Sequence, residues 1–162
     1  MKSLELGGWS FEPELLEFVL ANLSIGSTIL ELGSGAGTGV LSSAGYRMYS
    51  IEHNQKFINK YNSTYIYAPM VRYWYDKNIV KENLPLRYDA ILIDGPVGSE
   101  SKSRIGFYEN LALFDSSKMM IFDDTNRSGE RFLFECVLSE CNQTSPRKSF
   151  EGKTFSVIYA QQ

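Results

Sequence analysis

Short runs of apolar residues alternate along this chain with segments in which apolar residues recur every three or four positions. Short apolar runs bounded by turn residues are typical of buried strands, whereas the longer spacing indicates amphipathic helices. We predict strands at Ile29–Leu32, Arg47–Glu52, Thr64–Ala68, Tyr88–Asp94, Lys118–Asp124, Ser145–Phe150 and Thr154–Ala160. We predict helices at Phe11–Leu23, Val40–Ala44, Gln55–Tyr61, Ile105–Phe114 and Gly129–Cys141, with weaker helical spacing over Tyr73–Leu84.

The order of these elements predicts the fold class. Strands that alternate with helices form a parallel sheet covered on both faces by right-handed crossovers. The last two strands are joined only by Glu151–Lys153, which is too short for a crossover, so they form a hairpin and the last strand is antiparallel. We therefore expect an α/β, Rossmann-like doubly wound, mostly parallel seven-stranded sheet with a C-terminal antiparallel hairpin.

Length and composition restrict the classes of protein that this sequence can represent. The 162 residues fit one domain, in which 1–24 form an N-terminal cap segment and helix. A net charge of -3 gives no basic surface, so nucleic acid is not the favoured partner. No apolar run is long enough for a membrane span, and Met1–Ser3 leads into no signal-peptide core. With Cys136 and Cys141 too poorly spaced for a disulfide, we expect a cytoplasmic protein with reduced thiols.

Four glycines, Gly33, Gly35, Gly37 and Gly39, follow the first predicted strand. Glycines in such a position let the backbone turn sharply and approach a ligand, and the next helix offers free N–H groups. The NAD fingerprint fails because its third glycine would fall on Thr38 or Val40, and no phosphate-binding P-loop string occurs. The remaining pattern is an acid, Glu31, two residues before the first glycine. A glycine-rich turn that binds nothing is the alternative interpretation.

Acidic residues end four of the predicted strands: Glu31, Glu52, Asp94 and the pair Asp123–Asp124. Ligands of open α/β sheets bind beyond the carboxyl ends of the strands. Glu52 comes about twenty residues after the glycines begin, where a carboxylate can accept both hydroxyls of a ribose. A solvated acid at the start of a helix is the alternative for Glu52, and an Asx-turn ahead of Gly95 is the alternative for Asp94.

Four strings together resemble the class I S-adenosyl-L-methionine (SAM) dependent methyltransferases of a small bacterial type: L-E-L-G-S-G, S-I-E-H, Y-D-A-I-L-I-D-G-P and I-F-D-D-T-N-R. The resemblance extends from Gly7 to Arg127 and includes some similarity to catechol-type O-methyltransferases. It implies that SAM is bound by Trp9, Glu31, Gly33, Ser34, Gly35, Gly37, Glu52, His53 and Asp94. For Trp9 the alternative is a hydrophobic lid without contact to the cofactor.

The catechol-type similarity also implies a metal centre. By that match Asp94, Asp123 and Asp124 would bind Mg²⁺ or a similar hard cation, and Asp94 is the candidate catalytic residue. The sequence departs from the catechol type at Val97, where those enzymes carry a lysine that serves as general base. Lys102 and Arg104 follow in a loop whose position the sequence does not predict. A hydrogen-bonded turn in which Arg127 neutralises the aspartates is the alternative to a metal.

The resulting hypothesis is a SAM-dependent methyltransferase, EC 2.1.1.-, that acts on an oxygen of a small molecule or a saccharide. A SAM- or nucleoside-binding interaction module without transferase activity is one alternative, and a protein or nucleic-acid methyltransferase is another. The segment Asp94–Val97 lacks the aromatic residue that stacks on a flipped base, which makes a nucleic-acid substrate less favoured. The methyl acceptor would be held by loops such as Gly98–Arg104 and Tyr67–Tyr75 or by a partner subunit, so a homodimer is possible.

Overall fold

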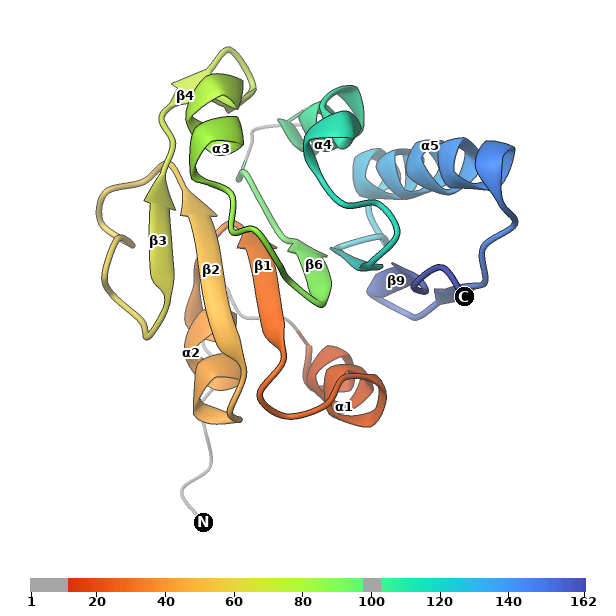
Figure 1. Ribbon diagram of the computed structural model, residues 1–162, viewed down its shortest axis with the longest axis horizontal. Helices are drawn as coiled ribbons and strands as arrows, with labels where there is room; N and C mark the ends of the chain where they lie inside the picture. Colours follow the sequence, from red (N-terminus) through yellow and green to blue (C-terminus); the bar gives the residue numbers. More distant parts are fainter. Residues whose placement is uncertain (1–11, 98–102) are drawn as a thin grey trace.

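The computed structural model describes residues 12–97 and 103–162 (Figure 1). In chain order, the elements are α1 (Pro13–Asn22), β1 (Thr28–Leu32), α2 (Ala36–Ser43), β2 (Arg47–Glu52), β3 (Thr64–Tyr67), β4 (Met70–Val71), β5 (Trp74–Tyr75), α3 (Lys77–Asn83), β6 (Ala90–Ile93), η1 (Ser103–Ile105), α4 (Gly106–Glu109), η2 (Leu111–Leu113), β7 (Met119–Asp123), α5 (Ser128–Thr144), β8 (Ser149–Glu151) and β9 (Phe155–Ile158).

Seven of the strands form one sheet in the order β3-β2-β1-β6-β7-β9-β8, and β4 and β5 form a separate antiparallel pair. Within this sheet the neighbouring strands β3, β2, β1, β6 and β7 are parallel, whereas β9 runs antiparallel to both β7 and β8. The predicted seven-stranded, mostly parallel sheet with a C-terminal hairpin is therefore confirmed. The strand order reverses between β1 and β6, and ligands of open α/β sheets bind beyond the carboxyl ends of the strands at such a point.

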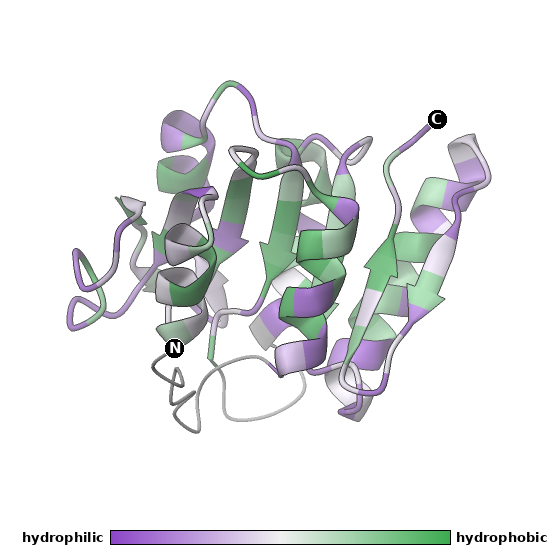
Figure 2. Ribbon diagram, turned by 90° about the horizontal axis from the view of Figure 1, so that it is seen from below, coloured by the Kyte–Doolittle hydropathy of each residue, from purple (hydrophilic) through white to green (hydrophobic). Residues whose placement is uncertain are grey.

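Both faces of the central strands β1, β6 and β7 are buried, which explains why these strands are almost continuously apolar. Leu30 and Ile91 face a core shared with Val80 of α3, Phe107 of α4 and Phe134 of α5. The other face carries Ile29, Leu92 and Ile121, which pack against Leu15 and Val19 of α1 and Leu41 of α2. In Figure 2 the central strands are mostly coloured as hydrophobic, and hydrophilic residues gather in the surrounding helices and loops. This packing fixes the positions of the strand ends.

The predicted helix Gln55–Tyr61 is wrong, because the structure forms successive turns there. Asn54 accepts a hydrogen bond from the Lys56 N–H through its side chain, and Asn59 has a φ of 60°. An Asx-turn and a left-handed residue both interrupt a helical hydrogen-bond ladder. Helical spacing alone does not register this competition from asparagine side chains.

Other predicted boundaries also change. Over Tyr73–Leu84 the helix begins only at Lys77, because Asp76 caps it and Trp74–Tyr75 pairs with β4. The predicted helix Ile105–Phe114 is divided among η1, α4 and η2. Helix α2 begins at Ala36 instead of Val40, α5 continues to Thr144, and β8 begins at Ser149. Within the described ranges, no helix has both the length and the apolar character needed to cross a membrane.

Candidate cofactor and metal site

The glycine-rich loop that follows β1 is in backbone contact with the loop that follows β6. Gly33 has a φ of +88°, and a Cβ atom placed on it would lie 2.9 Å from the carbonyl oxygen of Asp94. A Cβ atom on Gly95 would lie 2.7 Å from the Cα of Gly33. Only glycine combines this left-handed conformation with so close an approach. The contact brings the predicted cofactor loop and Asp94 to the same place at the sheet edge.

Glu31 lies beneath this loop and is 1% exposed. Its carboxylate accepts hydrogen bonds from the Thr38 hydroxyl, at 2.8 and 3.0 Å, and from the Ser50 hydroxyl at 2.7 Å. The Thr38 hydroxyl in turn accepts the N–H of Gly35 at 3.0 Å. Burial raises the pKa of Glu31 to about 8, although the hydroxyl contacts lower it. Glu31 therefore holds the loop from below, and its contacts in this structure are to hydroxyl groups of the chain.

Glu52 ends β2 and connects that strand to the glycine loop. Its carboxylate accepts the backbone N–H groups of Ser34 at 2.8 Å, His53 at 2.8 Å and Asn54 at 2.7 Å. Glu52 is 4% exposed and no helix follows it, so the alternative of a solvated acid at a helix start is wrong. Its Oε2 atom accepts one of these hydrogen bonds, from Ser34, and can accept another from a further donor. The predicted ribose acceptor thus lies beside the loop, as the sequence indicates.

The other predicted cofactor residues that the structure describes lie in or beside the same loop: Ser34, Gly35, Gly37 and His53. The Ser34 hydroxyl lies 3.0 Å from the Tyr65 hydroxyl, and Gly35 and Gly37 flank the start of α2. His53 places its Nδ1 atom 3.2 Å from Oε1 of Glu52 without hydrogen-bond geometry. Trp9, which we expected to cover the cofactor, lies outside the described residues, so its contribution remains a prediction.

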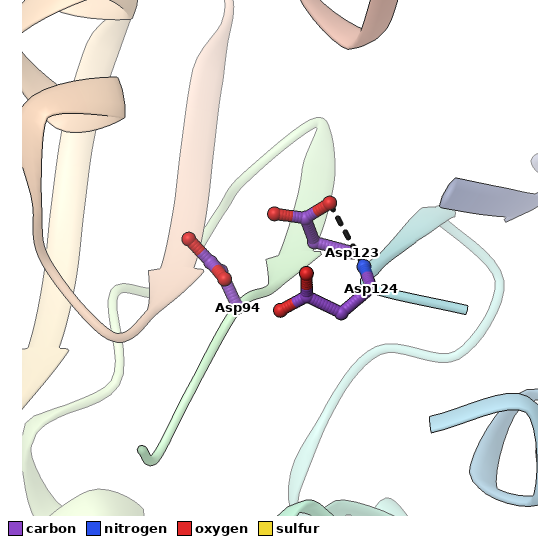
Figure 3. Close-up of side chains that lie close together, drawn as sticks. All are labelled: Asp94, Asp123 and Asp124. Atoms are coloured by element: carbon purple, nitrogen blue, oxygen red, sulfur yellow. Dashed lines mark hydrogen bonds between the residues drawn. The ribbon is translucent and has the colours of Figure 1, made fainter. Parts of the chain in front are cut away.

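Three carboxylates converge beyond the ends of β6 and β7 (Figure 3). One ligand oxygen each from Asp94, Asp123 and Asp124 lies within 4.8 Å of the others. Burial, together with repulsion from Asp123, raises the pKa of Asp94 well above its usual range. Burial, together with repulsion from Asp124, raises the pKa of Asp123 to about 6. The cluster predicted from acidic strand ends is therefore present, and burial is the main cause of the two raised pKa values.

Arg104 of η1 supplies the central positive charge of this cluster and is itself 7% exposed. Its Nη2 lies 3.0 Å from Oδ2 of Asp124 and 3.4 Å from Oδ1 of Asp94. It also donates to the backbone carbonyls of Asp94 and Asp123, at 3.1 and 3.3 Å. Arg127, which the alternative to a metal placed here, is 62% exposed and lies 3.3 Å from Oδ2 of Asp124. In that alternative the central counter-charge is therefore Arg104 and not Arg127.

Tyr75 lies at the contact between the loops after β1 and β6, although the sequence placed it only at the end of the loop Tyr67–Tyr75 that was expected to hold the methyl acceptor. It reaches the contact between the two loops from β5: a Cβ on Gly95 would lie 2.6 Å from its hydroxyl oxygen. In sequence, Tyr75 lies in a weakly helical aromatic segment, and nothing in the periodicity shows that its hydroxyl faces the strand ends. The only feature of the sequence that could have pointed to Tyr75 is its type and place, a tyrosine shortly after the third strand.

No family model and no curated protein sequence matches this chain. Among solved structures, it is similar to MycE methyltransferase from the mycinamycin biosynthetic pathway, in complex with Mg and SAH, with a TM-score of 0.58 and 11% identity over 93% of this chain. The chain spans only 46% of the MycE chain.

Two further solved structures have a length closer to that of this chain. A methyltransferase from Pyrococcus furiosus gives a TM-score of 0.57 and 13% identity, covering 92% of this chain and 82% of that one. The N-methyltransferase NodS from Bradyrhizobium japonicum WM9 gives 0.52 and 13%, covering 92% and 93%. With the strand order and the glycine loop, these similarities show that the chain has the class I SAM-dependent methyltransferase fold.

Proposed function

We propose that this protein is a SAM-dependent methyltransferase that transfers a methyl group to a hydroxyl oxygen of a small molecule or saccharide, with assistance from a divalent metal ion. The observation that carries the proposal is the convergence of two sites at one sheet edge. The glycine loop, which is bonded to Glu52 through the Ser34 N–H, contacts the backbone of Asp94 and Gly95 through Gly33. The carboxylate of Asp94 in turn lies with those of Asp123 and Asp124.

The residues around the glycine loop suit SAM. Glu52 can accept hydrogen bonds from ribose hydroxyls through its remaining oxygen capacity, and Gly33 leaves the backbone bare of side chains at the loop. Glu31, Thr38 and Ser50 keep the loop in one conformation before the ligand arrives, which reduces the entropy lost on binding. SAM would supply an activated methyl group at this position.

The acid cluster also fits a hard divalent cation. Carboxylate oxygens are the ligands that Mg²⁺ prefers, and three of them lie close enough to share one ion. Burial and mutual repulsion raise the pKa values of Asp94 and Asp123, and a bound cation would favour the ionised forms of both carboxyl groups. A bound cation would lower the pKa of an acceptor hydroxyl. The MycE structure reported above is a complex with Mg and SAH.

Asp94 is our candidate for the base. Its backbone carbonyl lies against Gly33 of the glycine loop, and its raised pKa makes its ionised carboxylate a stronger base than a surface aspartate. In the proposed reaction, the acceptor oxygen forms a bond to the methyl carbon while the bond from that carbon to sulfur breaks. The hydroxyl proton passes to the carboxylate, and the products are a methyl ether and S-adenosylhomocysteine (SAH).

One observation favours a second candidate function, a SAM-binding module without transferase activity. Arg104 already contacts the carboxylates of Asp94 and Asp124 and could serve in place of a metal as a purely structural charge. A methyl-transfer assay separates the two functions, because only an enzyme converts SAM into SAH in the presence of hydroxyl-bearing acceptors.

Isothermal titration calorimetry with SAM and with SAH, each with and without Mg²⁺, tests the proposal directly. We expect saturable binding of both nucleosides and of Mg²⁺, and no binding of NAD, which serves as the control ligand. Failure of SAM and SAH to bind would contradict the proposed function. Binding without any turnover across a panel of sugar and phenol acceptors would favour the binding module.

A further inference from the structure

The hydroxyl group of Tyr75 is buried at the site and has no hydrogen-bonding partner among residues 12–97 and 103–162. Tyr75 is 2% exposed, and no described residue donates to or accepts from its hydroxyl oxygen. The oxygen lies against the contact between Gly33 and Gly95, since a Cβ on Gly95 would approach it to 2.6 Å. The ring is fixed by Trp74, at a centroid distance of 5.6 Å, and by His53, at 6.1 Å.

Tyr75 differs in this respect from two other buried tyrosines, Tyr46 and Tyr88. Among the described residues, Nδ1 of His53, Nε1 of Trp74 and Oγ1 of Thr154 are also buried without a hydrogen-bonding partner. Tyr46 donates its hydroxyl hydrogen to the carbonyl of Leu23 at 2.8 Å, and the Tyr88 hydroxyl accepts the N–H of Asp115 at 2.6 Å. A buried polar group without a partner costs about 1–3 kcal/mol relative to a satisfied one. A phenylalanine would avoid that cost with the same ring packing, so a ligand is the natural partner for the Tyr75 hydroxyl.

The charges around this hydroxyl indicate which kind of ligand group would meet it. The carboxylates of Glu52, Asp94 and Glu31 all lie near enough to act on Tyr75, with Arg104 as the opposing charge. Burial first, and then these carboxylates, raise the pKa of Tyr75 well above its ordinary value, so the group remains a neutral phenol. Three carboxyl groups thus face this hydroxyl against one guanidinium. A ligand group that is positively charged and donates hydrogen bonds would favour the ionised forms of these carboxyl groups.

SAM carries one group with both properties. Its sulfonium is cationic but has no hydrogen to donate through nitrogen or oxygen, and its adenine amino group donates but is neutral. The α-ammonium of its methionine portion is cationic and has three donors. It is retained in SAH and is missing from 5′-methylthioadenosine, which keeps the adenine, the ribose and the sulfur.

We propose that the hydroxyl oxygen of Tyr75 accepts a hydrogen bond from the α-ammonium group of the cofactor's methionine portion, and so positions SAM between Glu52 and Asp94. This inference rests on the proposed function. It assigns to β5 a cofactor-binding role beyond those of the glycine loop and the acid at the end of β2.

The test compares Tyr75→Phe with wild type in two measurements, the thermal stability of the ligand-free protein and the affinities for SAH and 5′-methylthioadenosine. We expect Tyr75→Phe to be as stable as wild type or more stable, because it removes an unpartnered hydroxyl. Its affinity for SAH should fall about ten- to a hundredfold, as expected for a lost hydrogen bond to a charged group. Its affinity for 5′-methylthioadenosine should not change.

Tyr46→Phe is the matched control, because Tyr46 is equally buried but its hydroxyl has a backbone acceptor. It should lower the thermal stability and leave both affinities unchanged. An unchanged SAH affinity in Tyr75→Phe would overturn the proposal, and so would an equal loss for SAH and 5′-methylthioadenosine. A loss of stability in ligand-free Tyr75→Phe would also overturn it, since the hydroxyl would then have a partner within the protein. If wild type binds neither SAH nor SAM, the proposed function itself has failed.

Discussion

At Glu52 a single carboxylate both closes the end of β2 and faces the proposed ribose site, so its replacement has two effects. Glu52→Ala removes the acceptor of the Ser34, His53 and Asn54 N–H groups as well as the acceptor for the ligand. Hydrogen bonds to a charged group contribute about 1.5–3 kcal/mol, so SAH affinity measured by calorimetry should fall roughly ten- to a hundredfold. Glu82→Ala, at an exposed position on α3, is the control. Wild-type affinity in Glu52→Ala would contradict the assignment.

Glu31 makes the stability of the fold depend on pH. Its folded-state pKa of about 8 lies above its ordinary value of 4.5, so between these values the folded protein keeps a proton that the unfolded chain has released. Stability therefore falls as pH rises through this window, by up to about 1.4 kcal/mol per pH unit. Glu31→Gln keeps hydrogen bonding to Thr38 and Ser50 but does not titrate. Urea denaturation from pH 5 to 8 should show a shallower decline in Glu31→Gln, and identical slopes would contradict a raised pKa.

At the scale of elements, the site depends on the close approach of the loops after β1 and β6. Gly33 and Gly26 both have a φ of +88°, but only Gly33 faces a backbone, because nothing lies within 4 Å of a Cβ on Gly26. Gly26→Ala should cost about 1–2 kcal/mol of stability from the left-handed conformation alone. Gly33→Ala should cost a further 1–3 kcal/mol, about the cost of overpacking, because its Cβ meets Asp94. Equal losses in chemical denaturation would show that the loops can separate freely.

The strands could be predicted from the sequence because burial on both faces leaves runs such as Ala90–Ile93 entirely apolar. The segment Gln55–Tyr61 could not, because the side chain of Asn54 and the left-handed Asn59 favour turns over the helix that the apolar spacing suggests. Boundaries were the weakest part for the same reason. Side-chain caps such as Asp76 decide where a helix begins, and hydrophobic periodicity does not contain them.

For the candidate site, the sequence could predict only what strand topology dictates. Asp94 and Asp123 follow neighbouring parallel strands, so their convergence is a consequence of the strand order. Arg104 and Tyr75 come from irregular or very short elements outside the main sheet, η1 and β5. Their positions depend on tertiary packing, such as the contact of Trp74 with Gly106, and a local pattern does not encode that packing. This is why the alternative to a metal named Arg127 and not Arg104 as the counter-charge.

At the scale of the whole molecule, the metal proposal requires carboxylates at the ends of two neighbouring strands, β6 and β7, to act together. Asp123→Asn removes one carboxylate from the cluster while leaving the glycine loop and Glu52 unaltered. Loss of an outer-shell partner already weakens metal binding by about 10–100-fold, so loss of a direct ligand should cost at least as much. Calorimetry should therefore show a loss of at least about tenfold in Mg²⁺ affinity with little change for SAH.

Activity provides the second half of this test. EDTA should abolish methyl transfer by wild type, Mg²⁺ should restore it, and Glu135→Gln, at an exposed position on α5, should behave as wild type in both measurements. If transfer is indifferent to EDTA, Arg104 alone neutralises the cluster through its contacts with Asp94 and Asp124. Catalysis would then rest on the proximity of the two substrates and on a carboxylate base, for which Asp94 remains the first candidate because its raised pKa favours proton uptake.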